Sequence, residues 1–116
     1  MASERLLHYQ RLIEGACPWP PPEIDLLFRP MFGGLGIYTR GRIFAIVTSE
    51  GLAFKLDDYA QDELRETAPD AVNLSWTRKY LIAPPYVEDD PARLEDWMQR
   101  SVEYVQSLPP EKKKRR

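Results

Sequence analysis

The chain has 116 residues, of which 43% are hydrophobic, enough for one hydrophobic core and too few for two. Its formal net charge is −2, yet residues 111–116 carry five positive charges and one negative charge, so the rest of the chain carries −6. An acidic body argues against a broad nucleic-acid footprint on the folded part, which would need a concentrated basic face.

Membrane insertion and secretion are not expected from the sequence. No apolar run approaches the roughly 20 residues that cross a bilayer. The first residues, Met-Ala-Ser-Glu-Arg, also lack the basic-then-apolar order of a signal peptide. We therefore expect a cytoplasmic protein without membrane contact.

The N-terminal part predicts one helix and a stiff connector. Residues 4–14 have helical apolar periodicity, with Ser3 as the N-cap and Gly15 as the stop. The prolines of segment 18–22 then predict a polyproline-like connector within the domain. Trp19 lies in this connector, either folded back onto the domain, which is the favoured interpretation, or exposed as an anchor for an aromatic-lined groove.

The middle of the chain predicts three antiparallel strands, after a segment at 23–28 that is either a helical turn or an extended lead-in. Strands are expected at residues 35–39, 42–48 and 52–56. Arg40-Gly41 has the composition of a two-residue hairpin turn, and residues 49–51 that of a three-residue loop with a left-handed glycine. The second strand is apolar on both faces, which predicts a central, covered position, whereas the third alternates and should be half solvated.

The C-terminal half predicts a helix, two strands and a helix. The first helix should begin at Asp58, whose carboxylate is expected to cap it, with Gln61 completing a capping box. Strands follow at 72–76 and 79–83, and the last helix runs to residue 108 with Asp90 as N-cap and Pro91 at its first position. Residues 1–108 are thus expected to form one α+β domain with two layers and a five-stranded antiparallel sheet, of order α-β-β-β-α-β-β-α. Residues 109–116 are expected to be a disordered basic tail.

One short stretch gives the best clue to the family. It places closely spaced glycines between aromatic and aliphatic residues: Met31, Phe32, Gly33, Gly34, Gly36 and Tyr38. An apolar strand follows, then a Leu-x-Phe-x-Leu strand at 52–56, and later an acidic-Pro step leading to Leu94 and Trp97. Together these features resemble the N-terminal domain of the TfoX/Sxy family over about residues 4–108.

The resemblance carries implications for fold and role. It implies the fold type of secretion chaperones and a link to the regulation of bacterial competence genes, where the full-length regulators act with the cyclic-AMP receptor protein. No catalytic residues are established for the family, so the resemblance assigns none. We expect a stand-alone member without a second, helical domain.

No catalytic, cofactor or metal site is predicted. Gly33 to Gly36 invite a phosphate-loop interpretation, but a strand follows them instead of a helix, and no Gly-Lys-Ser/Thr run is present. Cys17 and His8 are the only cysteine and histidine, so a nucleophile or zinc site lacks partners. The carboxylate clusters at 57–58, 62–63 and 88–90 are better explained as caps and solvated surface.

Two functional hypotheses follow. The first is a non-enzymatic regulatory or protein-interaction module with an unidentified protein partner, in which Trp19 is a candidate contact. A homodimer would be consistent with a half-solvated sheet. The second is a nucleic-acid accessory protein that makes weak phosphate contacts through its tail: Lys112, Lys113, Lys114, Arg115 and Arg116. A small-ligand protein or enzyme with a site near Tyr38 is a distant third.

Overall fold

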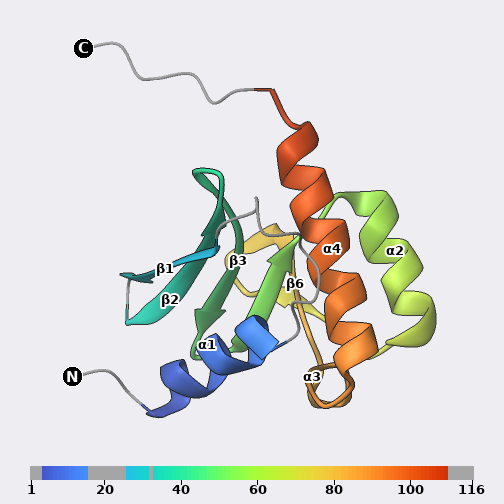
Figure 1. Ribbon diagram of the computed structural model, residues 1–116. Coiled ribbons are helices and arrows are strands. Elements are labelled where there is room, and N and C mark those ends of the chain that lie inside the picture. Colours follow the sequence, from blue (N-terminus) through green and yellow to red (C-terminus); the bar gives the residue numbers. More distant parts are fainter. Residues whose placement is uncertain (1–3, 16–25, 32, 110–116) are drawn as a thin grey trace.

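The computed structural model describes residues 4–15, 26–31 and 33–109. Within these ranges the chain forms one antiparallel sheet with helices packed against it (Figure 1). The elements, in chain order, are α1 (Glu4–Gly15), β1 (Leu26–Met31), β2 (Gly34–Thr39), β3 (Arg42–Thr48), β4 (Gly51–Lys55), α2 (Asp58–Thr67), β5 (Asn73–Leu74), β6 (Thr77–Ile82), α3 (Pro85–Glu88) and α4 (Pro91–Ser107). The prediction of an α+β fold with an antiparallel sheet is confirmed.

The sheet has six strands, so the prediction of five strands is wrong. Its spatial order is β1-β2-β3-β4-β6-β5. The additional strand is β1, which pairs with β2 from Leu26↔Thr39 to Met31↔Gly34. Pro30 lies within β1, and proline disfavours a central strand, but β1 is at the edge of the sheet, where a missing amide hydrogen is tolerated.

The C-terminal strands also differ from the prediction. The strand expected at 72–76 is reduced to the two residues of β5, and the strand expected at 79–83 begins earlier, at Thr77. The pairing of β5 with β6 is irregular, because Leu74 pairs with Thr77 whereas Asn73 pairs with Leu81. The short helix α3 was not predicted either; it lies in the connection between β6 and α4.

Both tight turns rely on positive φ angles. Arg40 and Gly41 have φ of 51° and 79°, which confirms the two-residue hairpin between β2 and β3. The three-residue loop predicted at 49–51 is wrong, since Gly51 already pairs with Thr48 as the first residue of β4. Gly51 has φ of 130°, so the connection still requires a glycine.

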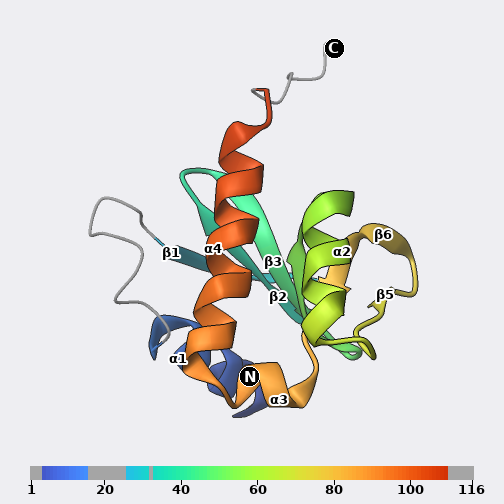
Figure 2. The ribbon, with the colours of Figure 1, turned by 90° about the vertical axis from the view of Figure 1, so that its right-hand side faces the viewer.

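Two apolar clusters lie on opposite faces of the sheet. The larger fills the space between the sheet and helices α1, α2 and α4; it includes Ile13, Phe44, Phe54 and Trp97, all at most 2% exposed. Figure 2 shows α4 passing in front of the strands. The smaller cluster lies on the other face: Ile46, Ala53, Leu74 and Tyr80, with Met31 and Ile82 packed against it. The prediction that β3 is covered on both sides is confirmed, whereas β4 is less solvated than predicted because Ala53 is buried.

A β-bulge in β3 faces helix α4. Ile37 pairs with Ala45 and Tyr38 with Ile43, so Phe44 has no residue opposite it on β2. Ser101 of α4, fully buried, lies within hydrogen-bonding distance of two carbonyl oxygens, Phe44 O at 2.7 Å and Lys55 O at 2.8 Å. Its hydroxyl therefore offers a donor to carbonyls where the ladder is interrupted.

Helix α2 is capped and anchored differently from the prediction. Its N-cap is Asp57 and not Asp58, since the Asp57 carboxylate accepts from Ala60 N at 2.8 Å. Gln61 does not complete a capping box but donates to the carbonyls of Leu56 at 3.0 Å and Arg78 at 2.9 Å. The N-cap predicted for α4 is confirmed, because Asp90 accepts from Ala92 N at 3.1 Å and Pro91 is the first helical residue.

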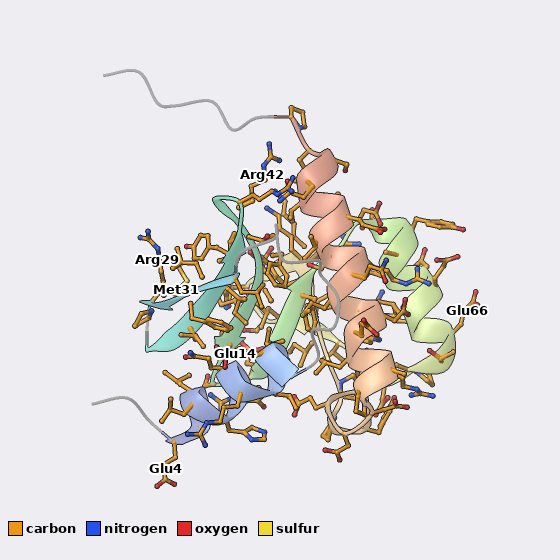
Figure 3. The ribbon with its side chains drawn as sticks, viewed as in Figure 1. Glu4, Glu14, Arg29, Met31, Arg42 and Glu66 are labelled. Atoms are coloured by element: carbon orange, nitrogen blue, oxygen red, sulfur yellow. The ribbon has the colours of Figure 1, made fainter. Side chains whose placement is uncertain are left out.

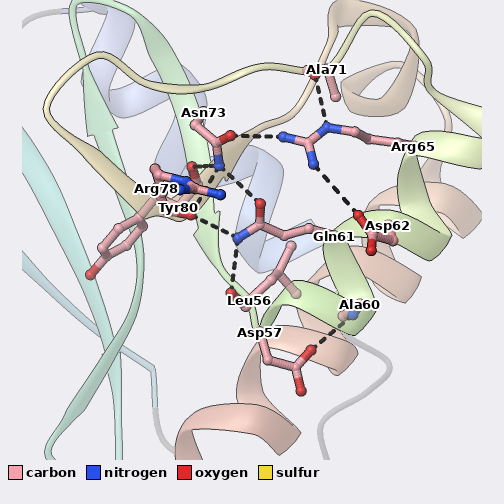
Figure 4. Close-up of polar contacts among 10 residues, drawn as sticks. All are labelled: Leu56, Asp57, Ala60, Gln61, Asp62, Arg65, Ala71, Asn73, Arg78 and Tyr80. Atoms are coloured by element: carbon pink, nitrogen blue, oxygen red, sulfur yellow. Dashed lines mark hydrogen bonds and ion pairs between the residues drawn. The ribbon is translucent and has the colours of Figure 1, made fainter.

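A polar network centred on Asn73 holds the edge strand β5 (Figure 4). The Asn73 amide nitrogen donates to Gln61 Oε1 at 2.9 Å and to the carbonyls of Arg78 and Tyr80, both at 3.0 Å. The Asn73 amide oxygen accepts from Arg65 Nη2 at 2.7 Å. Side-chain amides thus supply the hydrogen bonds that the short, irregular β5–β6 ladder lacks.

The buried serine of α4 is expected to stabilise the fold measurably. Ser101→Ala leaves the carbonyls of Phe44 and Lys55 without this donor, and the free energy of unfolding should fall by about 1–3 kcal/mol. Urea unfolding measures the change. The control is Ser107→Ala on the same helix, whose exposed hydroxyl bonds only Tyr104 O, and equal losses in the two variants would contradict the assignment.

A buried threonine of β2 is expected to be a stabilising target. Thr39 is 1% exposed, and its Oγ1 has no hydrogen-bond partner among the residues that the structure describes. Thr39→Val removes that buried hydroxyl and should raise the free energy of unfolding by about 1 kcal/mol. Thermal denaturation with Thr48→Val as control tests this, because the Thr48 hydroxyl accepts from Glu50 N and its loss should not stabilise.

Candidate functional site

The glycine motif forms the hairpin between β1 and β2. Met31 pairs with Gly34, and Gly33 between them has φ of 76°; Phe32 lies outside the described residues. A Cβ atom at Gly34 would lie 1.9 Å from Val47 O, so a side chain there would collide with the β3 backbone. These glycines therefore permit a turn and a close strand contact, and the phosphate-loop interpretation stays unsupported.

Gly36 lies on the sheet face that carries the smaller apolar cluster, opposite the helices. A Cβ atom at this position would lie 2.7 Å from Met31 Sδ, 3.1 Å from Tyr38 Cε1 and 3.3 Å from Ile43 Cδ1. Three side chains from β1, β2 and β3 thus converge above the space that Gly36 leaves empty. The motif residues Met31, Gly36 and Tyr38 therefore contribute to the sheet surface that faces away from the helices.

We call this surface the open face. It is the sheet face opposite the helices, and its residues follow from the register: Arg29 with Gly36 and Ile46, Tyr38 with Ile43, and Lys55 with Tyr80. None of the described helices contributes to the apolar cluster on this side. The side chains that form the open face are Leu27, Arg29, Met31, Tyr38, Ile43, Lys55, Tyr80 and Ile82, with Trp76 at its margin.

Aromatic rings on the open face are paired with each other or with a cation. The Arg29 guanidinium lies 5.8 Å from the centroid of the Tyr38 ring, and the rings of Trp76 and Tyr80 are 6.5 Å apart. Trp76 is 61% exposed, whereas Tyr80 is almost buried. Burial, and secondly the neighbouring Tyr38 hydroxyl, raise the pKa of Tyr80 to about 12, so its hydroxyl is protonated at neutral pH.

A hollow of about 320 Å³ adjoins the open face at the end of the β2–β3 hairpin. Tyr38, Ile43 and Lys55 reach it from the open face, and the last turn of α4 closes its other side. Arg42 joins the β2–β3 hairpin to the end of α4, because its Nη1 donates to the carbonyl of Val105 in α4 at 2.6 Å and to that of the C-cap, Leu108, at 2.8 Å. Figure 3 shows Arg42 beside the end of α4, with Arg29 and Met31 extending from β1. No carboxylate is among the residues that line the hollow: Tyr38, Gly41, Arg42, Ile43, Lys55, Val105, Leu108 and Pro109.

The residues that the sequence predicts to contact partners, Trp19 and 112–116, are outside the described part of the chain, as is Cys17. The prediction that Trp19 and residues 112–116 contact partners therefore stays a prediction. Pro109, the last described residue, lines the hollow, so the basic segment follows that site directly in sequence.

The acidic clusters have structural partners. Asp57 caps α2, and Glu63 bonds Arg100 at 2.6 Å, which joins α2 to α4 and lowers the pKa of the Glu63 carboxyl. Glu88 accepts from Tyr9 of α1 at 3.3 Å. Over residues 4–15, 26–31 and 33–109, no group of three or more His, Cys, Asp or Glu side chains could hold a metal ion.

Sequence reasoning missed the cations of the open face. Arg29 is in β1 and Lys55 in β4, so they are far apart in sequence. Only the pairing of the strands brings them to one surface. The alternation of Leu27, Arg29 and Met31 could have indicated a strand with one distinct face, but Pro30 obscured it.

Comparison with known families gives one match. The model of the TfoX N-terminal domain matches residues 25–105, which covers every strand of the sheet and most of α4. Helix α1 precedes this match, although its Ile13 is fully buried in the core. No curated protein matches the chain. Among the described residues, no helix is both long and apolar enough to cross a membrane.

The two motif glycines should differ in their tolerance of a side chain. Gly34→Ala places a methyl group against the carbonyl of Val47 and should lower the free energy of unfolding by more than about 3 kcal/mol. Gly36→Ala meets chiefly the flexible end of Met31 and should cost about 1 kcal/mol. Urea unfolding of both variants provides the measurement, and equal stability of the two would show that the strand contact at Gly34 is not limiting.

Proposed function

The chain belongs to the TfoX N-terminal domain family, and from this premise we propose that it is a regulatory protein that binds a protein partner instead of catalysing a reaction. The setting that we propose is transcriptional regulation in the bacterial cytoplasm, including the regulation of competence, to which the family resemblance links it.

The observation that supports this proposal is the open face. It exposes large apolar side chains next to cations, with Leu27 47% and Trp76 61% exposed. Exposed apolar and aromatic side chains on one surface are typical of protein-binding sites. Tyr, Trp and Arg are also the residue types that contribute most to binding energy at protein interfaces.

The chemistry of the same face favours binding over catalysis. Tyr80 has a pKa of about 12, which makes it a poor general base near neutral pH. The carboxyl of Glu88 has a pKa raised by burial, but Glu88 is the last residue of α3, accepts from Tyr9 of α1 and does not line the hollow. Neither group is placed to transfer a proton in the hollow beside Tyr38.

Nucleic-acid contact through residues 112–116 is the second candidate function. It is favoured by the position of Pro109 on the hollow that Arg42 and Lys55 line, because the five cations of residues 112–116 follow Pro109 closely in sequence. A salt titration of DNA and RNA binding with and without residues 110–116 tests it. Equal binding by the shortened chain would reject a role of the tail.

The protein-binding function is tested by affinity capture from nuclease-treated bacterial lysate. The immobilised full chain should retain a specific protein, and a Tyr38→Ser, Trp76→Ser variant should lose it, because both substitutions remove apolar contact area from the open face. The matched control is Tyr59→Ser, which removes a ring that is 71% exposed on α2. Capture of no macromolecule, or equal capture by the open-face variant, would contradict the proposal.

A further inference from the structure

Resting on the proposed function, we infer that the open face binds an acidic segment of the partner protein, with carboxylates at the cationic end around Tyr38 and apolar side chains along the rest of the face. The occupant is thus a polypeptide stretch that combines Asp or Glu with aliphatic or aromatic residues.

The charges around Tyr38 are positive, and the carboxylate at the far margin of the face, Glu50, is bonded to Ser75 N and Ser75 Oγ. Arg29 is exposed above Tyr38, and Lys55 and Arg42 line the hollow, in which no carboxylate takes part. The chain outside residues 111–116 carries −6, so these cations are gathered on one surface of an acidic protein. An acidic partner would be repelled by the acidic surfaces of the chain and attracted by the cations of the open face. This difference would orient its approach.

The chain's own basic segment does not fit as the occupant. It follows Pro109 at the rim of the hollow and carries five positive charges and one negative charge. Placing it against Lys55 and Arg42 would bring like charges together.

A second copy of the chain does not fit face to face either. Two-fold pairing of open faces would bring Arg29 and Lys55 of both copies onto a single interface, and the carboxylate at the margin of the face, Glu50, is already bonded to Ser75. The homodimer considered from sequence is therefore not assigned to this surface.

Side-chain exposure distinguishes a peptide from a nucleic acid. Bases bind sheet surfaces by stacking on open aromatic rings. Here Tyr80 is 9% exposed and the Tyr38 ring already has Arg29 over it, which leaves Trp76 as the one of these three rings that is largely exposed. The remaining area is aliphatic, from Leu27, Met31, Ile43 and Ile82. Apolar peptide side chains complement such area, and phosphate and sugar do not.

The experiment uses a library of random peptides displayed on phage, selected on the immobilised full chain. Peptides that combine Asp or Glu with aromatic or aliphatic residues should be enriched. Synthetic, fluorescent copies of the selected peptides should then lose affinity by about tenfold or more when Arg29→Glu and Lys55→Glu are combined. The matched control is Arg11→Glu on α1, an exposed arginine on the helical side of the sheet, which should leave affinity unchanged. Circular dichroism confirms that each variant is folded.

Salt and competition supply the second measurement. Affinity for the acidic peptide should fall as salt rises, and replacing its Asp and Glu by Asn and Gln should abolish most of the binding. Selection of neutral or basic peptides, or equal affinity for the charge-reversed variant, would overturn the inference while leaving the proposed function in place if lysate capture succeeds. Displacement of the peptide by oligodeoxythymidine at lower concentration than by unlabelled peptide would also overturn it, in favour of a nucleic acid. Failure of both the selection and the lysate capture would reject the proposed function itself.

Discussion

The contact between the backbones of β2 and β3 at Gly34 is the constraint on which the rest of the structure depends. The position that a Cβ would occupy lies 1.9 Å from Val47 O, so the two strands can approach only because no side chain is present. This approach sets the register in which Leu35 pairs with Val47 and Gly36 with Ile46. Because adjacent residues of a strand point to opposite faces, the same register fixes both the core beneath the helices and the surface opposite them.

Where the sheet departs from a regular ladder, polar side chains complete its hydrogen bonds. At the bulge in β3, Ser101 lies within bonding distance of the carbonyls of Phe44 and Lys55. At the irregular β5–β6 edge, Gln61 and Asn73 bond three carbonyl groups and one another. Each of these side chains is tied to several partners at once, so such networks specify one arrangement of helix on sheet as well as stabilising it.

Net charge proved a poor guide to the surface. The acidic average of the chain describes the regions of α2 and α4, where carboxylates cap, as Asp57 and Asp90 do, or pair, as Glu63 does with Arg100. It does not describe the open face, on which Arg29 and Lys55 stand among apolar residues. Residues of a strand point alternately to the two faces of the sheet, so strand pairing places Arg29 and Lys55 on the same face. The charge around Tyr38 is therefore positive, although the net charge of the chain is negative.

Local chemistry in the sequence determined the elements whose signals are local: the hairpin at Arg40-Gly41, the start of α4 at Asp90-Pro91, the apolar central strand and the family to which the glycine motif belongs. The tertiary structure alone decided that Leu26–Met31 is a sixth strand, because a proline is acceptable there only at a sheet edge, and edge position depends on the order of all strands. It also placed the cap of α2 at Asp57, and Gln61 bonds the carbonyls of Leu56, just after β4, and of Arg78 in β6. The composition of the open face also depends on the tertiary structure, because its residues come from separate strands. The sequence of one strand does not reveal which other strands will pair with it.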